Sequence, residues 1–147
     1  MQFNATSESL AQRGMELLVQ APFWAALFIR VNRRVEEHRA AALQLVLVDG
    51  APAIEVAPRH WAALKESEQL LAIQHELTHL LLGHPAQRTL YGAPFLYDVA
   101  ADLVVAQFLP EGVKFELDLD AAATDLDGLY QALIIAWEQE SQDLLAL

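Results

Sequence analysis

The sequence predicts an α+β fold that is mainly helical, with a small β-hairpin or sheet beside one of its helices. Apolar residues recur with helical spacing over most of the chain. Two short runs rich in branched residues flank Asp49-Gly50, a turn typical of hairpins. Ser67, a good N-cap residue, and Gly83, a good C′ residue, bound a further helical segment. Helices should therefore supply most of the structure around one small sheet.

The expected elements follow one another in a single domain, residues 1–147. Strands are expected at 43–48 and 53–56, and helices at 8–20, 22–38, 59–64, between Ser67 and Gly83, and at 95–108. Residues 85–96 have a turn-like composition, and 113–119 should be extended or irregular. Thr124, followed three residues later by Asp127, resembles a capping box at the start of a last helix.

Composition excludes several classes of protein. The chain has no cysteine, so any metal site must use His, Asp or Glu. A net charge of −11 disfavours nucleic acid as a partner. The N-terminus lacks the basic and apolar regions of a signal peptide, and the most apolar early stretch has about half of the ~20 residues that cross a bilayer. We therefore expect a cytoplasmic protein with no membrane partner.

The stretch "AIQHELTHLLLGH", residues 72–84, contains the main candidate site. On a helix, His75 and His79 project about 40° apart, close enough to bind one metal ion. Apolar side chains surround them, so the imidazoles and Glu76 must be buried. Since burying an unpaired polar group costs roughly 2 to 7 kcal/mol, these side chains require partners. A metal ion would satisfy them, and hydrogen bonds to buried carboxylates are the alternative.

Glu76 points about 100° away from His75, which suits a general base better than a ligand. Zinc lowers the pKa of a bound water to about 7, and a neighbouring carboxylate can take its proton. The pattern H-E-x-x-H is typical of zinc-dependent hydrolases but also occurs by chance. The uncharged flanks of this motif favour metal binding.

Three other side chains are candidates for the remaining ligand. Asp98 and Asp102 lie one turn apart on the predicted helix at 95–108. His84 follows the motif, but it is the tenth residue counted from His75, whereas metalloproteases with a third histidine in this region have it at position eleven. In a continued helix His84 would also point about 180° from His75, unless Gly83 turned the chain back. A capping or supporting role therefore suits His84 better.

The chain resembles a family of predicted zinc metallopeptidases of bacteria and archaea, which usually carry a von Willebrand A-like domain after the peptidase-like domain. The resemblance covers most of the chain. It rests on "APFWAALF", the strand pair before "APRHWAAL", "HELTHLLLGHPAQR", "YDVAADLVVA", and "FLPEG" before the helix around "LDGLYQAL". It implies a zincin-like fold and a peptide or protein substrate.

The resemblance also implies roles for particular residues. His75, His79 and Asp102 would bind Zn²⁺, and Glu76 would be the catalytic acid and base. The chain departs from the family pattern at Tyr97-Asp98, where tryptophan-asparagine is expected, and at Ala106, where asparagine is common. These departures concern substrate handling more than metal binding. Gluzincin peptidases, by similarity, would instead select Asp98 as the ligand.

Other side chains around the motif are candidates for supporting or substrate-binding roles. Asp98 could support a ligand histidine or pair with Arg88, and Arg88 could bind a substrate carboxylate. Tyr91 and Tyr97 could donate hydrogen bonds to a developing oxyanion, although such tyrosines more often only pack. Two functions follow: a zinc-dependent peptidase-like hydrolase, or a zinc-stabilised interaction module without turnover whose partner is a von Willebrand A-like or AAA ATPase protein.

Overall fold

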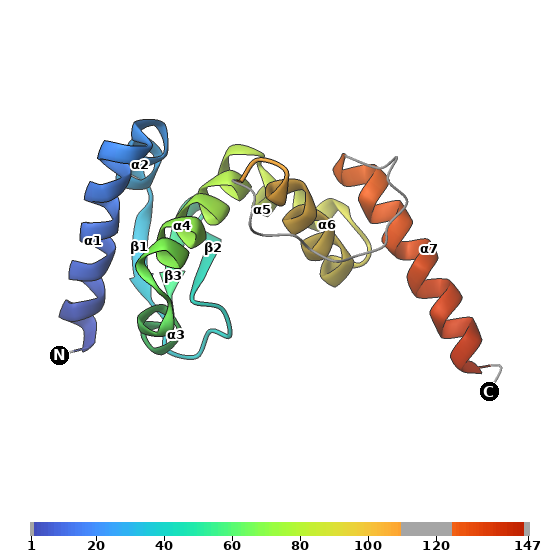
Figure 1. Ribbon diagram of the computed structural model, residues 1–147. Coiled ribbons are helices and arrows are strands. Elements are labelled where there is room, and N and C mark those ends of the chain that lie inside the picture. The colour runs from blue at the N-terminus through green and yellow to red at the C-terminus, as the bar shows by residue number, and fades with distance from the viewer. Residues whose placement is uncertain (1, 110–124, 146–147) are drawn as a thin grey trace. The chain divides into compact units, whose positions relative to one another are not determined.

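The computed structural model describes the backbone of residues 2–109 and 125–145 and the side chains of 5–109 and 125–140. The chain splits into two compact units, Met1–Pro85 and Ala86–Leu147. That residues 1–147 form a single domain stays a prediction. Figure 1 labels the α-helices and strands of both units, which are treated separately below.

The first unit combines helices with a small sheet, as the sequence predicted. Its elements are α1 (Gln2–Gln20), α2 (Pro22–Arg30), β1 (Asn32–Val35), β2 (Leu43–Val48), β3 (Ala51–Val56), α3 (Pro58–Ala63) and α4 (Glu66–Leu81). The described part of the chain is thus mainly helical with one three-stranded sheet, which agrees with the predicted α+β class.

The predicted hairpin is present and forms two strands of the sheet. β2 and β3 pair in antiparallel fashion, and Val48 lies opposite Ala51 across the turn. Both turn residues have positive φ, 52° for Asp49 and 80° for Gly50, as the two-residue hairpin turn requires. The strand order is β1-β3-β2, so β2 lies at one edge.

The prediction of one helix over 22–38 is wrong in its second half. α2 ends at Arg30, and β1 then pairs in parallel with β3, Asn32 opposite Ala53. The Arg33 side chain donates a hydrogen bond to the Phe28 carbonyl oxygen at 3.2 Å, which satisfies a backbone acceptor at the end of α2. Residues 32–35 form a strand because they pair with β3, which is distant in the sequence. The local periodicity of the sequence does not reveal this pairing.

The helix that carries the motif begins slightly earlier than expected. Its N-cap is Lys65 rather than Ser67, and the Glu68 carboxylate accepts a hydrogen bond from the Lys65 N–H at 3.3 Å. Ile73 and Leu77 are fully buried on α4. They belong to one core with side chains from the other elements of this unit, including Leu17, Phe28, Leu45, Ile54, Val56 and Trp61. This packing fixes α4 beside β2 (Figure 1).

The second unit is helical in its described residues. It contains a single 3-10 turn, η1 (Arg88–Leu90), and the helices α6 (Pro94–Ala106) and α7 (Leu126–Leu145), which pack together. α5 (His84–Gln87) crosses the boundary between the units. The predicted turn-like segment 85–96 therefore includes short helical turns.

The start of α7 differs from the predicted capping box. The Gly128 N–H donates a hydrogen bond to Asp125 Oδ1 at 2.7 Å, so Asp125 caps the first turn. Thr124 and the segment 113–119 lie outside the described residues. Over the described ranges, no helix has the length and apolar character needed to cross a bilayer.

Candidate metal centre

The two motif histidines converge on one side of α4. Their Nε2 atoms lie 3.0 Å apart, and their ring centroids are separated by 4.7 Å with 75° between the ring planes. Both side chains are partly buried. The four-residue spacing thus brings one nitrogen of each imidazole to a common point.

Glu76 links this site to the sheet. Its side chain is buried, and Oε2 accepts a hydrogen bond from the Leu45 N–H at 2.8 Å. Because Val48 and Ala51 flank the two-residue turn, the alternation of the ladder directs the Leu45 N–H away from β3. Leu45 is itself buried, so the carboxylate satisfies a backbone donor that would otherwise be costly. The edge strand therefore fixes the orientation of Glu76.

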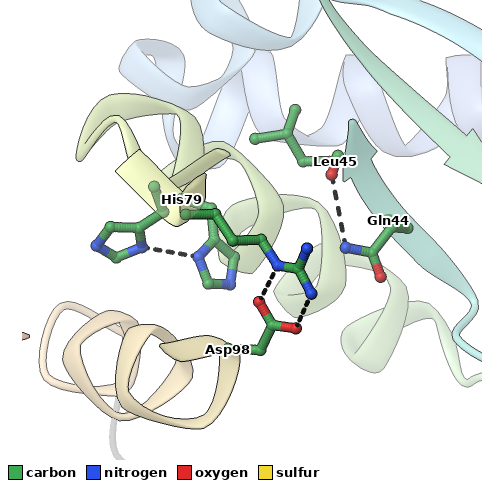
Figure 2. Close-up of polar contacts among 6 residues, drawn as sticks. Gln44, Leu45, His79 and Asp98 are labelled. Atoms are coloured by element: carbon green, nitrogen blue, oxygen red, sulfur yellow. Dashed lines mark hydrogen bonds and ion pairs between the residues drawn. The ribbon is translucent and has the colours of Figure 1, made fainter. Parts of the chain in front are cut away.

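His84 returns to the site because the chain reverses at Gly83. The Gly83 φ is 73°, a left-handed conformation that ends α4 and begins α5. His84 is buried, and its Nδ1 lies 2.9 Å from Nδ1 of His79 (Figure 2). His84 thus lies beside a motif histidine, on the ring edge remote from His75, and its supporting role stays a prediction.

The donors present fit a divalent metal of the zinc type. His75, Glu76 and His79 offer ligand atoms that all lie within 4.8 Å of one another. Two nitrogens bound to one tetrahedral zinc at 2.0–2.1 Å would be about 3.3 Å apart. The observed 3.0 Å separation is close to that value. Imidazole nitrogens suit zinc, iron, nickel and copper, so the donor set implies a metal of this group.

The two candidate aspartates of α6 differ in their surroundings. Arg88 binds Asp98 through two hydrogen bonds, Nε to Oδ1 at 2.8 Å and Nη2 to Oδ2 at 3.1 Å (Figure 2). Both side chains are about half exposed. The hydrogen bond to Asp98 raises the pKa of Arg88 above its usual value. Asp102, one turn further along, is half-buried, and its role as third ligand stays a prediction.

The candidate tyrosines form an aromatic cluster in the second unit. The centroid of the Tyr91 ring lies 4.6 Å from the ring centroid of Tyr97 and 4.8 Å from that of Tyr130. Tyr91 donates a hydrogen bond to Asp127, which raises the pKa of its hydroxyl to about 12. Burial raises the pKa of Tyr97 to about 12 as well. Both hydroxyls therefore stay protonated near neutral pH, and Tyr91 joins η1 to α7.

Comparison with known proteins identifies the family. Residues 5–125 match the model of a family described as "Putative metallopeptidase domain". The chain belongs to this family. The match covers most of both units of this metallopeptidase-domain protein and includes His75, Glu76 and His79. No curated protein and no solved structure matches the chain.

Some contacts of the site could not be read from the sequence. Leu45 lies 31 positions from Glu76, and only the expected hairpin hinted that a strand would lie beside the helix. Asp127 was marked only as part of the expected capping box, and Tyr130 had no signal apart from its place after that cap. For His84, the signal was Gly83, because glycine readily adopts the left-handed conformation that reverses the chain.

Proposed function

We propose that this metallopeptidase-domain protein is a zinc-dependent peptidase-like hydrolase. The observation that carries the proposal is the convergence of His75 Nε2 and His79 Nε2 on α4, with the Glu76 carboxylate next to them. Membership of the metallopeptidase-domain family supports the same reaction class. Asp102 is our candidate for the third ligand, by resemblance to the family.

Each residue has a defined task in this proposal. A zinc ion at this site would act as a Lewis acid and would make a bound water nucleophilic near neutral pH. His75 and His79 would hold the ion through their Nε2 atoms. The Glu76 carboxylate takes the proton of the attacking water and passes it to the leaving amine of the peptide. The Leu45 N–H keeps that carboxylate in place by binding Oε2.

The edge strand offers a binding mode for the substrate. β2 lies at the edge of the sheet and packs beside α4. An extended peptide can add to such an edge through main-chain hydrogen bonds at positions other than the Leu45 N–H, which Glu76 occupies, and this would align it next to the motif. This arrangement favours an unfolded or extended peptide segment over a compact folded substrate.

Replacement of Glu76 tests the proposal most directly. Glu76→Gln should leave zinc binding in place, because the ligand nitrogens are unchanged, but should abolish hydrolysis of a peptide library that the wild-type protein cleaves. His75→Gln is the matched control, in which zinc content and hydrolysis should fall together. Zinc-loaded wild-type protein that cleaves no peptide would contradict the proposal.

A zinc-stabilised interaction module is the second candidate. Exposed apolar side chains on α1 and α2 favour it, since Met15, Val19 and Phe23 are 70%, 84% and 57% exposed. Its partner would be a von Willebrand A-like protein or an AAA ATPase. Such a module would bind zinc and its partner equally well with Glu76→Gln, and the wild-type protein would show no hydrolysis to lose.

A further inference from the structure

His79 stands between two other imidazoles. Its Nε2 faces His75 Nε2 at 3.0 Å, and its Nδ1 faces His84 Nδ1 at 2.9 Å. The ring centroids of His79 and His84 are 5.1 Å apart, with 64° between the planes. The two nitrogens of one imidazole lie on opposite edges of the ring. His84 therefore contacts the edge of His79 that points away from the candidate metal position.

Two ring nitrogens at this distance share either a metal ion, as proposed for His75 and His79, or one proton, as expected for His79 and His84. A neutral imidazole carries its proton on only one nitrogen, and the other has a lone pair. To bind a metal through Nε2, His79 must carry its proton on Nδ1. That proton lies in the contact with His84, whose Nδ1 must then accept it. His84 is consequently protonated on Nε2.

We infer that His84 is the positioning residue of the metal centre, which holds His79 in the tautomer and orientation that direct its Nε2 lone pair at the ion. The inference rests on the proposed function for the presence of zinc. Ligand histidines usually donate their second N–H to a carboxylate, a backbone carbonyl or a water. Here a buried imidazole takes that place, and it does so without adding a negative charge beside the ion.

Local structure explains how His84 keeps this position. The Leu82 N–H donates to the Thr78 carbonyl oxygen at 3.0 Å, and the Gly83 N–H donates to that of Leu80 at 3.1 Å. These bonds close α4, and the left-handed Gly83 then directs the chain into α5. His84 is the first residue of α5 and is 5% exposed, so packing restricts its ring.

Two substitutions at position 84 test whether His84 acts as a hydrogen-bond acceptor or only packs against its neighbours. His84→Phe keeps a ring of similar size but has no acceptor. We expect a 10- to 100-fold loss of zinc affinity, measured by competition with a chelator. His84→Asn places an amide oxygen near the position of Nδ1, and it should restore most of that affinity. Thr78→Val, a change at a buried residue of α4 that keeps the backbone carbonyl bound by Leu82, should leave zinc affinity unchanged.

Nitrogen NMR of the zinc-loaded wild-type protein provides a second measurement that needs no variant. His79 should be protonated on Nδ1 and metallated on Nε2, while His84 Nδ1 should show the shift of an unprotonated acceptor. A protonated His84 Nδ1 would overturn the inference. So would wild-type affinity in His84→Phe, or an affinity in His84→Asn as low as in His84→Phe.

The remaining outcomes distinguish this inference from the proposed function. Loss of zinc with His84→Phe together with a spectrum that shows zinc on a His84 nitrogen would make His84 a ligand and overturn its positioning role. Zinc-loaded protein with the expected tautomers but no peptide hydrolysis would contradict the hydrolase and leave His84 in its role. Wild-type protein that binds no zinc would refute both.

Discussion

Asp98 and Asp102 lie one turn apart on α6, and Asp98 is paired with Arg88. Arg88 binds both carboxylate oxygens of Asp98, so metal binding through Asp98 would have to compete with a two-point ion pair. That competition counts against Asp98, and Asp102 stays the proposed ligand by resemblance to the family. The pairing of Asp98 with Arg88 is one of the roles that the sequence suggested for it.

Asparagine at each position tests this assignment. Asp102→Asn should abolish tight zinc binding, because the amide oxygen carries no charge for the ion. Asp98→Asn should weaken binding by at most about 10- to 100-fold, the usual effect of losing a supporting contact. Isothermal titration of metal-free protein measures both constants. The opposite ranking would assign the metal to Asp98.

Among the elements, the end of α4 has the most direct link to the site. Gly83 adopts a positive φ of 73°, and the position of His84 depends on the reversal that follows. Gly50 has a similar φ of 80° in the hairpin turn, with open space around the position of a Cβ. The two glycines therefore share a conformational requirement but differ in their relation to the metal centre.

Substitution of each glycine by alanine should show which of the two turns affects stability alone and which also affects metal binding. Each substitution should lower the free energy of unfolding by about 1 to 2 kcal/mol, because the left-handed conformation is costly for a residue with a Cβ. Urea denaturation measures this loss. Only Gly83→Ala should also weaken zinc binding, since only it displaces His84. Equal zinc affinities in the two variants would show that the turn does not support the site.

The tyrosine cluster that joins η1, α6 and α7 should make the second unit sensitive to alkali. The pKa values of Tyr91 and Tyr97 rise from 10 to about 12 on folding. Their contribution to stability is therefore complete below pH 10 and is lost as the pH rises toward 12. Tyrosinate absorbance and helical circular dichroism, followed over this range, should change together.

Tyr91→Phe provides the control for this alkaline transition. The variant lacks the hydrogen bond to Asp127 and should be less stable than the wild type at neutral pH. It should also lose less stability between pH 10 and pH 12, because one of the two shifted hydroxyls is absent. A wild-type cluster that ionises near pH 10 would contradict the role given to this bond.

For the whole molecule, metal binding should raise the free energy of unfolding. The helix that carries His75 and His79 is part of the main core of its unit through Ile73 and Leu77. An ion that binds only the folded chain raises the free energy of unfolding by about 2.7 kcal/mol at a free concentration 100 times Kd. Thermal unfolding with added zinc should show this increase, and His75→Gln should remove it. Equal midpoints with and without zinc would argue against a metal site.

The sequence predicted local features well and distant contacts poorly. The H-E-x-x-H spacing, the Asp49-Gly50 turn and the closing Gly83 depend on neighbouring residues, and the structure contains all three geometries. β1 was missed because its pairing with β3 joins residues about twenty positions apart. The Leu45 contact with Glu76 was missed for the same reason. Predictions from periodicity contain no information about such partners.

The two edges of the sheet differ in a way that bears on handling the protein in solution. β1 carries Arg33 and Arg34, and charged side chains on an edge strand discourage pairing with other chains. β2, with the sequence LQLVLV, has no charged residue along its length. Unwanted strand pairing between copies at high concentration should therefore begin at β2, at positions other than the Leu45 N–H that Glu76 occupies. An extended peptide that occupies this edge would act as a solubilising additive during concentration, and a lysine at Gln44 would provide the same protection permanently.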